Sequence, residues 1–244
     1  MAEVKKMKYC VNGEWKESAT DKWMTVTDSS TGEAIAEIPC CTEDEVHSAI
    51  AAAHAAFPSW SQMSLTKRTQ YLFKWRNVMI DHLDELTLIC AKELGKTLDE
   101  AKGDVLKAIE PTEFATSIPY TIQGSSALQV TTGFDCTTYR VPLGVVAGIV
   151  PMNFPAMIPW GWMVPLAIAC GNTVVLKANS QTPLTSMRML ELFYDEAGFP
   201  KGVVNLVTCS RHEAEIFMTD ERIKAVSFVG TTGVGKHIYS VAAA

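Results

Sequence analysis

The second half of the chain alternates short apolar runs with longer amphipathic stretches. The apolar runs are rich in Val, Ile and Leu, which is typical of strands buried on both faces of a sheet. The stretches between them have helical spacing, and strands that alternate with helices predict right-handed crossovers and a parallel sheet. We expect strands at 144–150, 173–177, 203–207 and 225–229, and helices at 162–170, 183–196, 211–219 and 231–241.

The first half of the chain predicts short strands followed by helices. Alternating apolar positions around an Asn12-Gly13 turn indicate a hairpin within residues 8–39. A capping box and an apolar face predict a helix over 42–57, and Pro58 is expected to end it. Further helices follow, and we expect Pro111 to kink or restart the last of them.

Residues 126–141 have a different pattern, because apolar and polar side chains alternate one by one. Leu128, Val130 and Phe134 have polar neighbours, which is the period of a half-buried strand. The run is long and precedes the predicted parallel sheet. We therefore interpret 122–141 as a projecting β-ribbon whose open edge needs a partner. The alternative is an ordinary edge strand within the monomer.

Composition narrows the class of protein. With 48% hydrophobic and 20% charged residues, the 244-residue chain can bury a sizeable core. The net charge of −6 argues against nucleic acid or an anionic membrane surface as a partner. Seven cysteines without paired spacing are typical of reduced thiols, and neither a signal peptide nor a membrane-spanning run is predicted. We therefore expect a cytoplasmic protein without a metal site.

Asn153 is the one polar side chain in an apolar loop that follows the first predicted parallel strand. Pro151 and Pro155 flank it and stiffen the loop. Open α/β sheets bind ligands at the carboxyl ends of their strands. An amide held there can donate a hydrogen bond to an oxygen that develops negative charge. The alternative is an Asn that only turns the chain.

A second candidate site is the glycine-rich segment 230–235, which follows a predicted strand and opens a predicted helix. Glycines permit close approach of the backbone, and a helix N-terminus offers free N–H groups to phosphate. The spacing is GxxGxG and not GxGxxG, so a plain tight turn is the alternative. The strand–loop–helix context favours phosphate binding and a Rossmann-like α/β sheet with flanking helices.

Four separated motifs resemble the aldehyde dehydrogenase superfamily. They are PLGV at 142–145, PMNFPAMIP at 151–159, ACGNTVVLK at 169–177 and SFVGTTGVGK at 227–236. The similarity runs from about Tyr9 to the last residue. NFPAMIP and GDVLKAIE at 103–110 look most like the methylmalonate/malonate-semialdehyde dehydrogenase branch. The resemblance implies an NAD(P)-dependent oxidoreductase that oxidises a small aldehyde through a cysteine thioester.

The resemblance also implies roles in binding NAD or NADP. Lys177 would contact the adenosine ribose, and Thr231 would contact the pyrophosphate. The superfamily often has Glu where this chain has Ser180, and loss of that carboxylate removes repulsion against a 2′-phosphate, so we expect NADP to be tolerated or preferred. The expected cofactor-binding residues are Ile149, Val150, Pro151, Met152, Lys177, Ser180, Gly230, Thr231 and Val234.

Two further residues receive roles from the resemblance. The amide of Asn153 would form an oxyanion hole together with the backbone N–H of a nucleophilic cysteine. Lys107 stands where the semialdehyde branch has an arginine that holds the substrate carboxylate, so it is expected to bind a small anionic aldehyde. A helix-surface lysine without a role is the alternative for Lys107.

The resemblance divides the chain into an NAD(P)-binding domain over 1–121 and 142–244 and an oligomerisation ribbon at 122–141, implying a homodimer or homotetramer. The superfamily's nucleophilic cysteine lies beyond the equivalent of Ala244, so we expect the catalytic domain to be absent and this chain alone to be inactive. Water or coenzyme A would accept the acyl group. Two alternatives stay open: an NADP-linked succinate-semialdehyde dehydrogenase and a dinucleotide-binding module without turnover.

Overall fold

A six-stranded sheet forms the centre of the fold in this computed structural model, which describes residues 4–244. Its order is β11-β8-β9-β10-β2-β3. The strands from β11 to β10 are parallel, which confirms the predicted α/β fold, whereas β2 and β3 run antiparallel, so the sheet is mixed. The strands are β2 (Tyr9–Val11), β3 (Glu14–Lys16), β8 (Val145–Ile149), β9 (Thr173–Lys177), β10 (Val204–Val207) and β11 (Ile223–Phe228).

The N-terminal strands divide between two sheets. β2 and β3 form the predicted hairpin, and its turn residues Asn12 and Gly13 have φ angles of 57° and 68°, as a tight hairpin turn requires. The other strands, β1 (Lys5–Lys6), β4 (Trp23–Thr27) and β5 (Ala34–Pro39), form a separate three-stranded sheet.

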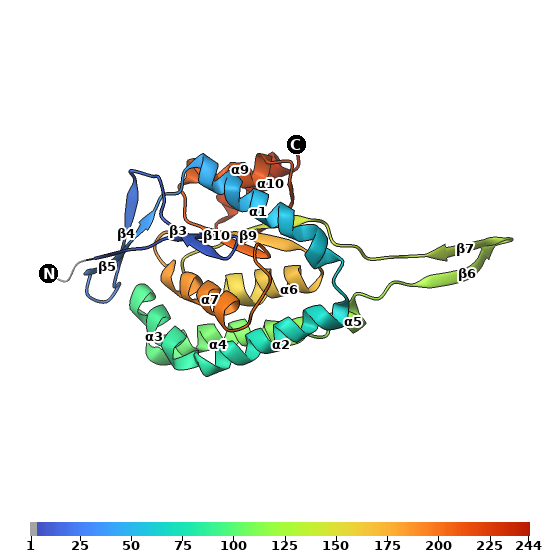
Figure 1. Cartoon of the computed structure of the whole chain (residues 1–244), viewed down its shortest axis with the longest axis horizontal. Helices are drawn as coiled ribbons and strands as arrows, with labels where there is room; N and C mark the ends of the chain where they lie inside the picture. Colours follow the sequence, from blue (N-terminus) through green and yellow to red (C-terminus); the bar gives the residue numbers. More distant parts are fainter. Residues whose placement is uncertain (1–3) are drawn as a thin grey trace.

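Helices cover both faces of the central sheet. Figure 1 shows α1, α9 and α10 on one face and α2, α3, α4, α6 and α7 on the other. No helix within residues 4–244 has the length and apolar character that crossing a membrane requires. The helices are α1 (Glu43–Ser61), α2 (Leu65–Asp81), α3 (Leu83–Leu94), α4 (Leu98–Ala115), α5 (Ile118–Thr121), the π-helix η1 (Ile158–Met163), α6 (Val164–Ala169), α7 (Leu184–Asp195), α8 (Arg211–Ala214), α9 (Ile216–Thr219) and α10 (Thr232–Ala242).

The parallel strands supply side chains to a separate hydrophobic cluster on each face. Val174 and Leu176 of β9 join the cluster beneath α2, α4 and α7, whereas Val175 between them joins the cluster beneath α1. All three side chains are buried. Burial on both faces explains why these strands read as continuous apolar runs in the sequence.

Several predicted boundaries were wrong. Helix α1 does not end at Pro58 but continues to Ser61. It persists because Trp60 is buried and its Nε1 donates to the carbonyl oxygen of Ile168 at 3.0 Å, which offsets the backbone hydrogen bond that proline removes. Likewise α4 runs through Pro111 without restarting. The helix predicted at 211–219 is broken into α8 and α9, and the one at 162–170 begins earlier, as the π-helix η1.

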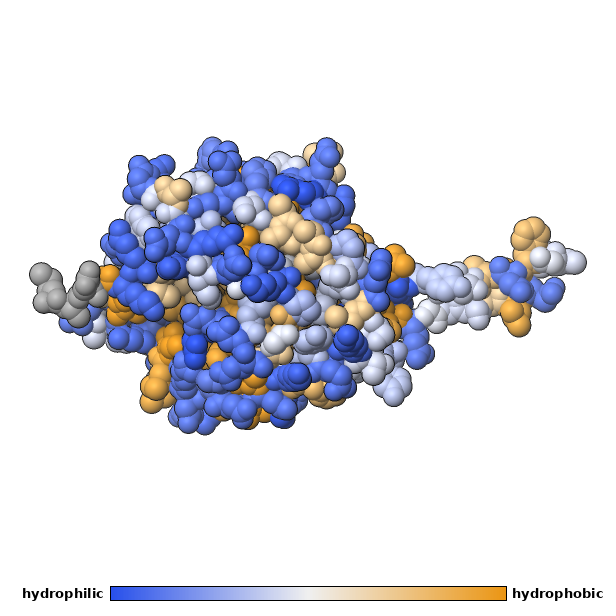
Figure 2. Space-filling model, viewed as in Figure 1, coloured by the Kyte–Doolittle hydropathy of each residue, from blue (hydrophilic) through white to orange (hydrophobic). Residues whose placement is uncertain are grey.

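The predicted ribbon is present and projects from the body of the molecule. It consists of β6 (Ser126–Thr131) and β7 (Phe134–Thr137), which pair antiparallel. Figure 2 shows it extending away from the rest of the molecule, with hydrophobic residues near its tip. Leu128, Val130 and Phe134 are 76%, 62% and 67% exposed. The ribbon is therefore exposed on both faces, not half-buried as the alternation predicted.

Candidate functional site

A cavity of about 540 Å³ opens where the four parallel strands end. Ile149 is the last residue of β8, Lys177 is the last residue of β9, and Cys209 follows β10. Thr231 follows β11 and stands at the N-cap position of α10. All four residues line the cavity. Parallel strands bring their carboxyl ends to one edge of a sheet, so residues far apart in sequence meet there.

The N-terminus of α10 forms one wall of this cavity. Thr231 has extended backbone angles (φ −73°, ψ 152°), and its hydroxyl makes no capping hydrogen bond to the helix. The hydroxyl and the first N–H groups of α10 therefore stay available to a ligand. A Cβ on Gly233 would meet no atom within 4 Å, so the glycine leaves open space there. A Cβ on Gly230 would lie 2.4 Å from the ring of Phe228, so any other residue there would require this ring to move.

Charged side chains share the cavity with apolar ones. Lys177 and Arg211 line it from β9 and α8, and Glu215 pairs with His237 across it at 2.7 Å. Ile149 contributes an apolar wall. Two cations, a helix N-terminus and an apolar surface together suit a ligand that carries both phosphate groups and an apolar ring.

Among the described residues, Cys209 is the one cysteine in the cavity wall, and it is poorly suited to act as a nucleophile. The side chain is buried, and burial raises the pKa of its thiol to about 12. A thiol with such a pKa carries almost no reactive thiolate near neutral pH.

Within residues 4–244 no group of three or more His, Cys, Asp or Glu side chains is placed to hold a metal ion.

The structure brings together five of the predicted cofactor-binding residues. Ile149, Lys177, Ser180, Thr231 and Val234 all line the cavity. Sequence reasoning missed Arg211, Glu215 and His237, although the order of strands and helices placed α8 directly after a strand that ends at this edge. Gly230 lies next to Thr231 in the chain and shapes the loop without lining the cavity.

The other predicted cofactor-binding residues do not line this cavity. Val150 is buried and packs with Ile158 in a small separate cluster. Pro151 is half-buried, and Met152 is exposed and lines a second cavity of about 310 Å³ together with Glu93. Their contact with a cofactor stays a prediction.

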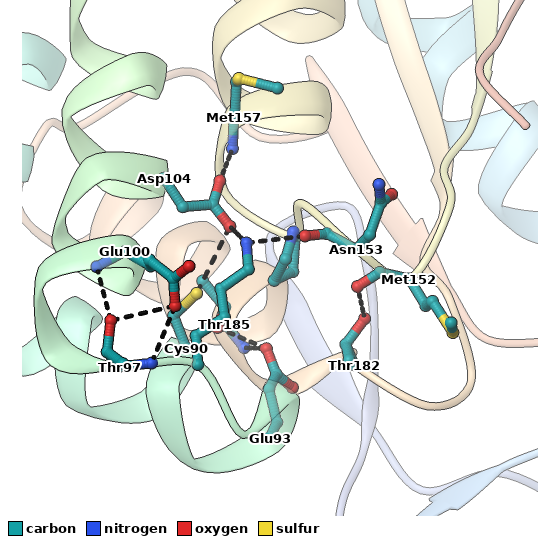
Figure 3. Close-up of polar contacts among 12 residues, drawn as sticks. Cys90, Glu93, Thr97, Glu100, Asp104, Met152, Asn153, Met157, Thr182 and Thr185 are labelled. Carbon is teal, nitrogen blue, oxygen red and sulfur yellow. Dashed lines mark hydrogen bonds and ion pairs between the residues drawn. The ribbon is translucent and has the colours of Figure 1, made fainter. Parts of the chain in front are cut away.

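Asn153 is exposed in the loop after β8. Lys96 donates from Nζ to the backbone oxygen of Asn153 at 2.8 Å, whereas the carboxamide makes no hydrogen bond to the described residues. In Figure 3 this amide points away from Asp104. The amide is therefore free to donate to a ligand, although Asn153 is not part of the wall of the large cavity.

Lys107 lies on the exposed surface of α4. Its Nζ forms an ion pair with Glu110 at 2.7 Å, one turn along the same helix. This surface pair fits the alternative of a helix-surface lysine, and a role in binding substrate stays a prediction.

Comparison with known proteins supports the same family as the sequence motifs. The sequence profile of the aldehyde dehydrogenase family matches residues 15–244. A malonate-semialdehyde dehydrogenase of Bacillus cereus (strain B4264) is 45% identical over 237 residues, which cover 97% of this chain and 48% of that protein. The chain thus spans about half the length of such curated relatives.

Solved structures give the same result. A putative methylmalonate-semialdehyde dehydrogenase from Sinorhizobium meliloti 1021, complexed with NAD, superposes with a TM-score of 0.96 at 32% identity, covering 100% of this chain and 49% of the other. An NADP-dependent enzyme of E. coli superposes with a TM-score of 0.93 at 31% identity, covering 98% and 49%. The cavity at the strand ends and the profile match over most of the residues lead to one conclusion: the chain belongs to the aldehyde dehydrogenase family.

Proposed function

We propose that this chain supplies the cofactor-binding half of an NAD(P)-dependent dehydrogenase that oxidises a small anionic aldehyde. The observation that carries the proposal is the cavity of about 540 Å³ between four parallel strand ends and the N-terminus of α10. The malonate-semialdehyde dehydrogenases among the relatives suggest a semialdehyde as the substrate. In domain terms, 1–121 and 142–244 would bind the cofactor and 122–141 would form the oligomerisation ribbon.

The residues present fit an adenine dinucleotide. The Thr231 hydroxyl and the first N–H groups of α10 would hold the pyrophosphate, and the open space beside Gly233 leaves room for it. Lys177 would donate to the ribose hydroxyls. Ser180 and Arg211 line the same cavity and would donate hydrogen bonds to a 2′-phosphate. We therefore propose that the chain binds NADP in addition to NAD. When bound, the nicotinamide accepts hydride from the substrate.

The chain's own contribution to the chemistry is the amide of Asn153. It would donate to the substrate oxygen as negative charge develops there, together with a backbone N–H supplied from outside this chain. We propose that the attacking thiolate also comes from elsewhere. Burial raises the pKa of six thiols, those of Cys10, Cys40, Cys41, Cys90, Cys170 and Cys209, and the seventh cysteine, Cys136, lies on β7 of the projecting ribbon and does not line the cavity. The thioester would then pass its acyl group to water or to coenzyme A.

Lys107 and the cavity wall bear on which semialdehyde is the substrate. Lys107 keeps the positive charge of the arginine expected in the semialdehyde branch but lacks its bidentate geometry. An NADP-linked succinate-semialdehyde dehydrogenase is a second candidate, favoured by Ser180 and Arg211 in the cavity wall. Turnover with malonate semialdehyde and succinate semialdehyde, compared in the complete enzyme with each cofactor, separates the two candidates.

A homo-oligomer is also proposed. The ribbon β6–β7 exposes both faces, and a two-stranded ribbon with apolar side chains on its surface gains stability from pairing with another chain. We expect sedimentation to show a dimer or a tetramer, and we expect Val130→Lys to shift the population towards monomer. Unchanged sedimentation in that variant would remove the ribbon from the interface.

The central test is binding of NAD and NADP to this chain by isothermal titration calorimetry. Gly233→Asp places a carboxylate in open space beside the N-terminus of α10, where it repels phosphate but suits the helix. We expect it to weaken binding of both cofactors by more than tenfold. Gly103→Asp is the matched control, because a Cβ there also meets nothing within 4 Å and the position lies on α4, away from the cavity.

Three results would contradict the proposal. Equal binding by Gly233→Asp and wild type would place the dinucleotide elsewhere or nowhere. Dehydrogenase activity of this chain alone would show that one of its own thiols attacks the aldehyde. Binding without turnover in the complete protein would instead favour a dinucleotide-binding module that carries out no chemistry.

A further inference from the structure

The loop that carries Asn153 (151–157) is fixed by hydrogen bonds from polar side chains of other segments. Thr182 donates from its hydroxyl to the backbone oxygen of Met152 at 2.7 Å, and Ser186 of α7 donates to the backbone oxygen of Pro155 at 2.8 Å. Lys96, between α3 and α4, donates to the backbone oxygen of Asn153. Each of these bonds fixes a peptide group of the loop, and the Asn153 carboxamide takes part in none of them.

Asp104 of α4 connects the two ends of this loop. Its Oδ1 accepts a hydrogen bond from the backbone N–H of Met157 at 2.8 Å, and its Oδ2 lies 3.3 Å from Nζ of Lys96. The Asp104 side chain is fully buried. A buried carboxylate is stable only when its oxygens have hydrogen-bonding or ionic partners. The contacts with Met157 and Lys96 therefore stabilise Asp104 in its buried position.

Lys96 makes three contacts at once. Its Nζ is 2.8 Å from the backbone oxygen of Asn153, 3.3 Å from Asp104, and 4.0 Å from the centroid of the Phe154 ring. The Lys96 side chain is only 19% exposed. Charge-assisted hydrogen bonds are shorter and stronger than neutral ones, and a largely buried cation is weakly screened by solvent. The ammonium therefore fixes the peptide plane that follows the Asn153 side chain.

We propose that Lys96 and Asp104 are positioning residues that hold the Asn153 amide in its productive direction. Figure 3 shows the arrangement on which this rests: the network binds the backbone of the loop, and the amide points away from it. A hydrogen-bond donor contributes most to catalysis when it is held in place before the reaction begins. The inference rests on the proposed role of Asn153 as oxyanion donor, and the network itself can be tested without turnover.

The test compares three variants of this chain by NMR. Lys96→Met removes the ammonium and keeps the length of the side chain, whereas Lys96→Arg keeps a cation with several donors. Lys102→Met is the matched control, because Lys102 is exposed on α4 and has no side-chain partner among the described residues. The side-chain amide signal of Asn153 is assigned by its loss in Asn153→Ala, and circular dichroism reports the melting temperature.

We expect Lys96→Met to shift and broaden the Asn153 amide signal, Lys96→Arg to restore it, and Lys102→Met to leave it unchanged. In the complete dehydrogenase, Lys96→Met should lower kcat about tenfold to a hundredfold with unchanged KM for aldehyde and cofactor, because a small displacement of a catalytic donor costs turnover and not binding. Lys96→Arg should recover most of this loss.

The opposite results are equally clear. A lower melting temperature with an unchanged Asn153 signal would show that Lys96 only stabilises the fold, and would overturn the inference. An unchanged kcat in Lys96→Met would also overturn it. Failure of the wild-type chain to bind NAD would refute the proposed function, whereas the NMR comparison would still decide whether Lys96 holds the loop.

Discussion

Glu93 makes the stability of this chain depend on pH in an unusual direction. The residue lies on α3, is fully buried, and accepts hydrogen bonds at the start of α7 from the backbone N–H groups of Leu184 and Thr185 and from the Thr185 hydroxyl. Burial raises the pKa of its carboxyl from an ordinary value of 4.5 to about 7, because the hydrogen bonds offset only part of the desolvation. Between pH 4.5 and about pH 7, Glu93 therefore keeps a proton in the folded chain that it releases in the unfolded chain.

The sign and size of the effect follow from this pKa. A carboxyl with a raised folded-state pKa contributes its full stabilisation to the folded state below pH 4.5. This contribution is lost as the pH rises through 7. At about 1.4 kcal/mol per unit of pKa, the loss between pH 5 and pH 8 amounts to about 2–3 kcal/mol. That is a large fraction of the ~5–15 kcal/mol by which proteins are stable.

The assay is urea unfolding of wild type and Glu93→Gln at intervals from pH 5 to pH 8. We expect the free energy of unfolding of wild type to fall by about 2–3 kcal/mol relative to Glu93→Gln over this range, since glutamine does not titrate. Glu33→Gln is the control, because Glu33 is exposed and its side chain has no partner in the described part of the chain. Parallel curves for wild type and Glu93→Gln would refute the reasoning.

Three further predictions concern packing and the proposed site. Gly161→Ala should destabilise the chain by about 1–3 kcal/mol in urea unfolding, because the new Cβ would lie 2.8 Å from the backbone oxygen of Lys107, whereas Gly103→Ala, in open space on α4, should stabilise it by about 0.5–1 kcal/mol; a similar loss in both would contradict the packing argument. Lys177→Met should weaken NAD binding about tenfold in calorimetry without changing the melting temperature, and equal affinity would exclude a ribose contact. Asn153→Ala should leave NAD affinity unchanged but cost the complete enzyme about 3 kcal/mol of transition-state stabilisation, and normal turnover would remove Asn153 from the mechanism.

Much of the fold could be predicted from the period of apolar residues. The strand predicted at 173–177 matches β9 residue for residue, because burial on both faces gives an apolar run with sharp ends. Local signals misled where a distant contact decided the outcome. Pro58 predicts the end of a helix, and only the partner of Trp60 in α6, 108 positions away in sequence, explains why α1 continues.

The candidate site was predictable to the extent that it depends on strand ends. Lys177 and Thr231 could be placed at one edge because each follows a recognisable parallel strand. The partner of the Asn153 backbone could not, because Lys96 lies 57 positions earlier and nothing in its local sequence distinguishes it from a surface lysine. Which side chain reaches a loop depends on how helices cross the sheet, and that arrangement has no short sequence signature.

The edge position of β11 has a consequence for how this chain would respond to a ligand. Within the part of the chain that the structure describes, β11 pairs only with β8, none of its side chains is buried, and α10 buries a single side chain, that of Ile238. A unit with so few interior contacts opens at lower free energy than the rest of a domain. A ligand held between this unit and the interior strands would suppress that opening. At ligand concentrations too low to change the free energy of global unfolding, amide hydrogen exchange should therefore already slow at residues 223–242.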